Sequence, residues 1–202
     1  MKTKLYLARH GQTLWNKVQR FQGQFDSELT AVGKQQSENI AQQLADKNID
    51  LIVSSSLGRA IASANICQQQ LNVPVINVDG LIERNLGHWQ GKHVDDIKSD
   101  KNYHEILHQF TELKPVDGES AVQCGARIYQ TLQSLAENNS SKSILVIFHG
   151  EALRCLLAKL GESSTDNAYE LFDNGCLLTL TYQHQHQNHS FQLIDKMAET
   201  IK

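Results

Sequence analysis

The sequence lacks any apolar run long enough to cross a lipid bilayer, and its first residues lack the apolar core and cleavage site of a secretion signal. It also lacks a surplus of positive charge, because 19 lysines and arginines stand against 22 aspartates and glutamates. Proteins that bind nucleic acids or anionic membranes normally carry such a surplus. We therefore expect a cytoplasmic protein with no membrane or nucleic-acid partner, in which any positively charged site is local.

Cysteine and proline are both scarce. The cysteines, Cys67, Cys124, Cys155 and Cys176, are widely spaced and form no Cys-x-x-Cys pair, which argues against a zinc site or a disulfide framework and favours buried thiols. There are only two prolines, and no repeat or low-complexity tract marks a linker. A chain with 40% hydrophobic residues can bury a core without help, so residues 1–202 are expected to form one domain.

The sequence does contain short apolar runs that alternate with helical patterns. Residues 4–8, 50–55, 73–78 and 143–148 are rich in Val, Ile and Leu and are bounded by polar or turn residues, as in strands covered on both faces. Helical spacing between them aligns three sets of apolar side chains: Val32, Ile40 and Leu44; Val122, Ala126, Tyr129 and Leu132; and Leu153, Leu156, Leu157 and Leu160. This order predicts an α/β fold with a largely parallel sheet between two layers of helices.

Two regions depart from this alternation. Residues 176–183 and 191–196 flank the polar run HQHQNHS and predict an antiparallel hairpin, which makes the sheet mixed. The three histidines of that run are expected at an exposed tip and not around a metal. Residues 91–115 show the weakest periodicity, which is typical of a segment that folds over a site as a lid.

Charged side chains follow each predicted parallel strand. Arg9 and His10 follow the first strand, Arg59 the second, Glu83 the third and His149 the fourth. Because ligands of open α/β sheets bind at the carboxyl ends of the strands, these groups are expected to meet there. Clustered cations repel one another unless an anion lies between them, and arginine forks match phosphate oxygens. The pattern therefore indicates a site for a phosphoryl group.

Two of the strands end in the same dipeptide, His10-Gly11 and His149-Gly150. One histidine of such a pair can attack phosphorus, while the other donates a hydrogen bond to the oxygens that gain charge. Gly11 and Gly150 lack the Cβ that would hold the backbone away from the anion.

With these blocks in place, the sequence resembles the histidine phosphatase superfamily, also called the phosphoglycerate mutase-like family. The resemblance rests on five blocks in order, ARHGQTLWN, FQGQFDSELTAVGKQQ, SSSLGRAIASA, ERNLGHWQG and VIFHGEALR, which span nearly the whole chain. It implies a three-layer α/β/α sandwich with a six-stranded, mostly parallel mixed sheet.

The resemblance also implies roles for individual residues. His10 would be the phosphorylated nucleophile and Glu83 the general acid and base, while Arg9, Arg59, His149 and Asn16 would hold the phosphoryl group. Gln22, Gly23 and Gly150 would lie near the substrate. No metal and no cofactor are expected, because fixed guanidinium groups supply the positive charge. A simple ion pair of Glu83 with Arg84 is the alternative for that carboxylate.

The same family contains hydrolases and mutases. The stretch 91–118 is short, has no arginine, and balances its lysines with acids, so it offers no evident clamp for a second acidic group. This favours a phosphomonoester hydrolase acting on small phosphorylated metabolites. The alternatives are a phosphoglycerate mutase-type phosphotransferase and an inert phosphoryl-binding regulatory protein. The side chains around the leaving group stay open, with Trp15, Phe21, Trp89 and Tyr103 as candidates, and a homodimer is compatible with the sequence.

Overall fold

The computed structural model describes residues 1–162, 172–184 and 190–197, with side chains up to residue 194. One sheet holds six strands, β1 (Lys2–Arg9), β2 (Leu51–Ser55), β3 (Val75–Val78), β4 (Ser143–Phe148), β5 (Leu177–Gln183) and β6 (Ser190–Met197), in the order β3-β2-β4-β1-β5-β6. β3, β2, β4 and β1 run parallel to one another, whereas β5 pairs antiparallel with both β1 and β6. The predicted strands and the predicted hairpin are thus confirmed; the tip at 185–189 lies outside the described residues.

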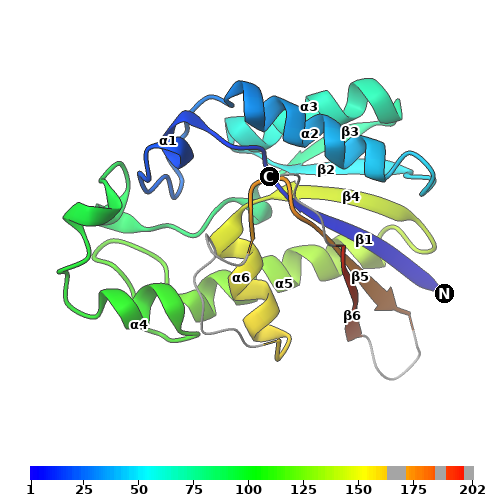
Figure 1. The fold of residues 1–202 in the computed structure, drawn as a ribbon. Helices are drawn as coiled ribbons and strands as arrows, with labels where there is room; N and C mark the ends of the chain where they lie inside the picture. Colours follow the sequence, from blue (N-terminus) through cyan, green and yellow to red (C-terminus); the bar gives the residue numbers. More distant parts are fainter. Residues whose placement is uncertain (163–171, 185–189, 198–202) are drawn as a thin grey trace.

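Helices cover both faces of this sheet (Figure 1). α2 (Ala31–Gln43) and α3 (Gly58–Leu71) pack on one face, and α5 (Ala121–Glu137) and α6 (Gly150–Lys159) pack on the other. Alternate residues of β4 show why both faces are apolar: Ile144, Val146 and Phe148 enter the α5/α6 core, while Leu145 and Ile147 enter the α2/α3 core. This arrangement is the expected three-layer α/β/α sandwich.

The predicted apolar face of α2 was right at two of its three residues and wrong at its first. Ile40 and Leu44 are fully buried as predicted, but Val32 is 55% exposed and the helix buries Gly33 in its place. The reason lies in Gly33, because a Cβ there would come within 2.0 Å of the Gln12 carbonyl oxygen. The helix must turn this glycine inward so that its backbone can approach the loop after β1.

The predicted face of α5 needs a similar correction. Val122, Ala126 and Tyr129 are only half-buried, whereas Leu132 is fully buried as expected. The buried face is centred on Gly125, where a Cβ would lie 2.7 Å from the Cys155 carbonyl oxygen of α6. Close approach of the two helices therefore sets the rotation of α5, and side-chain hydrophobicity alone does not reveal it.

The weakly periodic segment forms short ordered elements with a core of their own. It contains η3 (Val94–Asp96) and α4 (Tyr103–His108), next to η2 (Gly87–Trp89). Their apolar side chains pack with those of the N-terminal loop in a third cluster: Phe21, Leu86, Trp89, Ile97, Ile106 and Leu107. α4 projects beyond the strand ends on the side of α1 (Leu14–Lys17), as Figure 1 shows. The remaining short element, η1 (Asp79–Leu81), leads from β3 toward Glu83.

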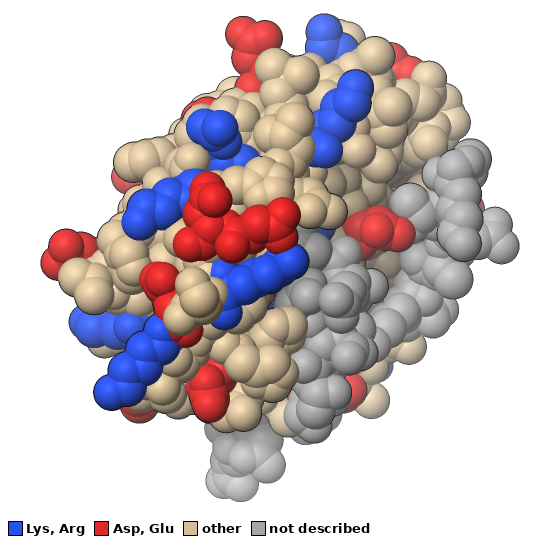
Figure 2. Space-filling view, turned by 60° about the vertical axis from the view of Figure 1, so that its left-hand side comes forward, with Lys and Arg blue, Asp and Glu red and all other residues tan. Residues whose placement is uncertain are grey.

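Within the described residues, no helix is long and apolar enough to span a membrane. All four cysteines are free thiols, and three of them are buried. On the face that carries α1 and α4, several acidic side chains gather near the centre, with basic side chains next to them (Figure 2).

Candidate active site

The carboxyl ends of β1 and β4 bring two distant histidines together. The rings of His10 and His149 lie with their centroids 5.2 Å apart, and both side chains are buried. β1 and β4 are adjacent parallel strands in which Arg9 is opposite Phe148, so the residues that follow them leave the sheet at the same edge. The two His-Gly dipeptides, far apart in the sequence, therefore lie next to each other in the structure.

His10 is held as a neutral ring with a defined tautomer. Its Nδ1 lies 2.8 Å from the Gly11 carbonyl oxygen, which can only accept, so Nδ1 carries the proton. Its Nε2 accepts a hydrogen bond of 3.2 Å from Nε of Arg59. Burial, followed by the charges of Arg59 and Arg9, holds the pKa of His10 well below its usual range. The Nε2 lone pair is consequently available for nucleophilic attack near neutral pH.

His149 is buried next to His10. Its Nε2 lies 2.7 Å from Oγ of Ser55, and its buried Nδ1 has no hydrogen-bond partner among the described residues. Burial and then the charge of Arg59 hold the pKa of His149 well below its usual range. The Ser55 hydroxyl accepts from the Leu57 N–H and can donate its own hydrogen to Nε2 of His149; in that arrangement Nδ1 is the protonated nitrogen.

The Arg59 guanidinium is oriented by the loop after α1. Nη2 donates to the Gly23 carbonyl at 2.7 Å, while Nη1 donates to the Phe25 carbonyl at 2.6 Å and to Asp26 at 3.2 Å. Gly23 adopts a left-handed φ of +53°, and a Cβ there would meet Oε1 of Gln90 at 2.2 Å. Gly23 therefore acts on the site through Arg59. Gln22 is buried, and its Oε1 has no hydrogen-bond partner among the described residues.

The glycines that follow the two histidines serve the packing of the protein itself, which corrects the reason expected from the sequence. A Cβ on Gly11 would lie 2.0 Å from the Gly33 carbonyl oxygen, and the Gly11 N–H donates to Oγ of Ser63. A Cβ on Gly150 would lie 3.1 Å from Nε of Arg9. Gly11 thus lets α2 approach, and Gly150 gives space to the Arg9 side chain, which donates to the Phe172 carbonyl.

Glu83 binds to the start of α6. Its Oε1 accepts from the N–H groups of Arg84 and Ala152, both at 2.8 Å, and its Oε2 accepts from the N–H of Glu151 at 3.3 Å. Burial first, and then the negative charge of Glu151, raises the pKa of the Glu83 carboxyl. The alternative of an ion pair with Arg84 is wrong, because the Arg84 guanidinium pairs with Glu151 at 3.2 Å.

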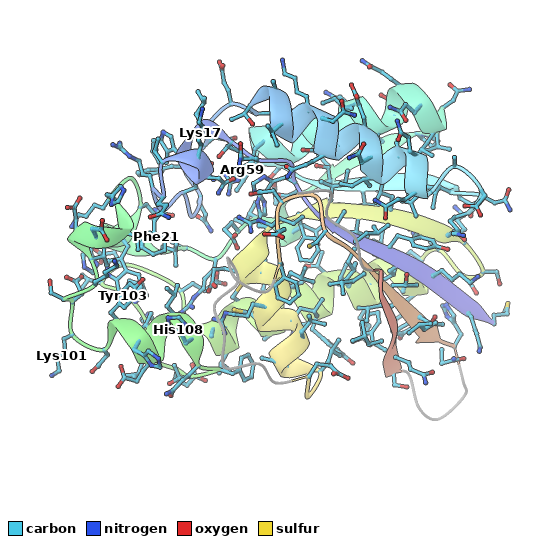
Figure 3. All side chains as sticks on the ribbon, viewed as in Figure 1. Lys17, Phe21, Arg59, Lys101, Tyr103 and His108 are labelled. Atoms are coloured by element: carbon cyan, nitrogen blue, oxygen red, sulfur yellow. The ribbon has the colours of Figure 1, made fainter. Side chains whose placement is uncertain are left out.

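A cavity of about 570 Å³ opens beside Arg9 and extends toward α4. Arg9, Gln12, Asn16 and Asn174 line one part, and Arg20, Phe21, Lys98, Tyr103 and His108 are among the residues that line the rest. In Figure 3, Phe21, Tyr103 and His108 lie on the side of α4, across from Arg59. Of the aromatic candidates, Trp89 is instead buried, and Trp15 stacks under the Arg20 guanidinium at 5.3 Å.

Asn16 lines this cavity with its carbonyl oxygen already engaged. Its Oδ1 accepts from the N–H and Oγ1 of Thr13, both at 3.1 Å, and from Asn174 at 3.2 Å. Asn174 also donates to the His10 carbonyl at 3.0 Å. Sequence reasoning missed Asn174 and Ser55, because neither forms part of a charged or periodic pattern; only the position of Ser55 at the end of a strand marks it.

The described residues contain no group of three or more His, Cys, Asp or Glu side chains that could hold a metal ion. What they do form is a buried cluster in which Arg59 donates to one of two adjacent imidazoles, the charges of Arg9 and Arg59 act on both rings, and the charge of Arg59 also acts on the Glu83 carboxyl. Such an arrangement fits an enzyme that transfers phosphoryl groups.

Comparison with known proteins assigns the chain to a family of such enzymes. The family model of the histidine phosphatase superfamily (branch 1) matches residues 5–192, and the chain belongs to this family. The match confirms the recognition made from the motifs, the fold, and the activity class of a phosphatase.

Individual relatives differ in what their names state. A probable phosphoglycerate mutase, GpmB of Yersinia pestis, is 34% identical over 78% of this chain and 74% of its own. A mycobacterial glucosyl-3-phosphoglycerate phosphatase has a similar structure, with a TM-score of 0.79 and 26% identity over 94% of this chain and 96% of its own. The structure of a phosphoserine phosphatase of Entamoeba histolytica in complex with phosphoserine has a TM-score of 0.78 and 31% identity, over 96% of this chain and 95% of its own.

Proposed function

We propose that this chain is a metal-independent phosphatase that hydrolyses small phosphomonoesters through a phosphohistidine at His10. The observation that carries the proposal is the pair of buried imidazoles, 5.2 Å apart, in which Nε2 of His10 is the unprotonated nitrogen. An unprotonated ring nitrogen is the nucleophile that the first step needs.

In the first step, Nε2 of His10 attacks phosphorus in line with the ester oxygen, so that a P–N bond forms while the P–O bond breaks. Arg9, Arg59, Asn16 and His149 take up the charge on the other oxygens, His149 through its Nδ1–H. The departing alkoxide needs a proton, and Glu83 is the group proposed to give it. Burial raises the pKa of Glu83, which favours the protonated form that this step requires.

In the second step, the Glu83 carboxylate takes a proton from water as the water oxygen attacks phosphorus. The P–N bond breaks, inorganic phosphate leaves, and His10 and Glu83 return to their starting states. The guanidiniums supply the positive charge that Mg²⁺ supplies in many other phosphoryl-transfer sites.

A mutase is the second candidate, because a relative is named as a probable phosphoglycerate mutase and because the cavity wall holds Arg20 and Lys98. These cations come from different segments, which is why the stretch 91–118 alone gave no sign of a clamp. Lys98 is already paired with Asp95 at 2.5 Å, so we favour hydrolysis. Phosphorus NMR of a reaction with phosphoglycerate separates the two, since a phosphatase releases inorganic phosphate and a mutase yields the positional isomer.

We further propose a cytoplasmic location and small phosphorylated metabolites as partners, in keeping with the net charge of −3 and the size of the cavity. A homodimer stays a prediction that sedimentation velocity would test.

The proposal is tested by rapid quenching with a ³²P-labelled phosphomonoester. We expect an acid-labile label on the wild-type chain and none on His10→Ala, with hydrolysis abolished in the same variant. His104→Ala, which changes an exposed histidine on α4, is the matched control and should label normally. Hydrolysis by His10→Ala at the wild-type rate would rule out this nucleophile.

A further inference from the structure

A buried ion-pair network lies directly against Glu83 and has no part in the steps above. Glu151, at the start of α6, is only 2% exposed. Its Oε2 lies 3.2 Å from Nη1 of Arg84 and 3.1 Å from Nη2 of Arg154, and its Oε1 accepts from Nε of Arg154 at 3.1 Å. Both arginine side chains are also buried. Burying three charges is costly, so a purely structural purpose would be served better by apolar residues of similar volume.

The network and the Glu83 carboxyl share the same two residues. Arg84 and Glu151 each donate a backbone N–H to Glu83, at 2.8 and 3.3 Å, and their side chains pair with each other. Backbone and side-chain bonds therefore form a closed ring around Glu83. Arg84 also donates to the Ile106 carbonyl at 2.8 Å, which connects the ring to α4, whose Leu107 and His108 line the cavity described above.

The charges around Glu83 come from every element that packs against it. They are Arg59 of α3, Arg127 of α5, Glu151 and Arg154 of α6, and Arg84 and Glu119 of the neighbouring loops. Arg127 forms a bridge to Glu119 at 2.8 Å, and Glu151 offsets the two arginines it contacts. If Glu151 were uncharged, the positive charges of Arg84 and Arg154 would act on Glu83 without compensation and would favour its ionised form.

We propose that Glu151 is a positioning residue which, through its ion pairs with Arg84 and Arg154, holds Glu83 in place and keeps it protonated for the release of the leaving group. This inference rests on the proposed function, in which Glu83 supplies the proton. Glu151 touches neither the phosphoryl group nor the reacting atoms in this account, so it acts only through Glu83.

Glu151→Gln tests the inference without a change in volume. Loss of the negative charge should lower the pKa of Glu83, so the basic limb of the kcat/KM profile should move to lower pH by about one unit. At neutral pH an alkyl phosphate, whose leaving group needs a proton, should be cleaved about tenfold more slowly. An aryl phosphate with an acidic phenol as its leaving group should change little, because its departure needs no proton.

Arg154→Met supplies a test of opposite sign. Removal of this cation leaves Glu151 less compensated, so the basic limb should move to higher pH. General damage to the fold would not shift two variants in opposite directions. Glu137→Gln serves as the control, because Glu137 accepts from the Tyr182 hydroxyl at 2.7 Å near the opposite end of the sheet, and its profile should match the wild type.

Two further outcomes are decisive. If the basic limb of the kcat/KM profile is unchanged in both Glu151→Gln and Arg154→Met, and His10 is still labelled normally, the role of Glu151 is overturned while the proposed function stays intact. If the wild type fails to label, or Glu151→Gln fails to fold, carbon-13 NMR titration of Glu83 decides the inference, with Glu83→Gln used for assignment. In that titration, Arg154→Met must raise the pKa of Glu83, and no change would overturn the inference.

Discussion

At the scale of the residue, the two histidines differ because their hydrogen-bond partners differ. His10 has a carbonyl at Nδ1, which leaves Nε2 unprotonated, whereas His149 has a hydroxyl at Nε2. In the proposed function, these partners prepare His10 as the nucleophile and His149 as a hydrogen-bond donor. The sequence predicted both histidines from their place after a strand, but it contains no information on tautomers, because these depend on Gly11 and Ser55 in three dimensions.

Ser55→Ala tests the assignment for His149. Without the hydroxyl, Nε2 loses its partner, the proton can occupy either nitrogen, and the donor to the phosphoryl oxygen is weakened. We expect kcat to fall by about 10- to 100-fold, with a parallel loss of vanadate affinity and continued labelling of His10. Steady-state kinetics with vanadate inhibition measure both effects. Wild-type kcat in this variant would show that Ser55 does not orient His149.

At the scale of the element, the sequence predicted which segments are strands more successfully than which way the helices face. Strands of this sheet are buried on both sides, so their hydrophobic runs are unambiguous. The predicted face of α2 was wrong only at Val32, next to Gly33, whereas that of α5 was rotated toward Gly125; both glycines are buried because they lack a side chain. α4 was missed because its six residues pack on Phe21 and Trp89 from distant segments, which local periodicity cannot reveal.

Gly33→Ala tests this account of α2. The added methyl group would meet the Gln12 carbonyl, so the helix must move away from the loop that carries His10. We expect a loss of about 1–3 kcal/mol in the free energy of unfolding, together with reduced activity. Val32→Ala, one residue away on the exposed side, should change stability by no more than about 0.5 kcal/mol. Urea unfolding of both variants makes the comparison, and equal effects would contradict the close packing of Gly33.

At the scale of the whole molecule, the site exists only because four parallel strands end at one edge. Sequence reasoning reached this juxtaposition from strand order alone, and the structure brings Arg9, His10, Arg59, Glu83 and His149 to that edge. What it could not reach was the support around them, including the Glu151 network and the loop that carries Asn174. Those contacts join segments separated by 67 residues for Arg84 and Glu151 and by 164 for His10 and Asn174, with no periodic signal.

Stability should depend on pH because His10 and His149, the two histidines of the candidate site, are buried. Their pKa values are lowered in the folded state, so the unfolded chain binds more protons below its own histidine pKa of 6.5. The stability they contribute is present above that pH and is lost as the pH falls, by at most about 1.4 kcal/mol per pH unit for each histidine. Glu83, whose pKa is raised, opposes this trend at the acidic end.

Urea unfolding between pH 5 and pH 8 measures this dependence. We expect the urea concentration at the midpoint of unfolding to decrease as the pH is lowered below about 6.5. In His10→Gln the free energy of unfolding should change less steeply with pH, because one titrating group is gone. An identical slope in this variant would mean that His10 is not held neutral by the fold.

The central claim is that imidazoles from two distant parts of the chain enclose a single phosphoryl group, and a crystal structure with bound vanadate tests it most directly. We predict vanadium in line with Nε2 of His10, with its equatorial oxygens contacted by Arg9, Arg59 and Nδ1 of His149. Vanadate bound away from His10, or through a different nitrogen of that ring, would contradict the account.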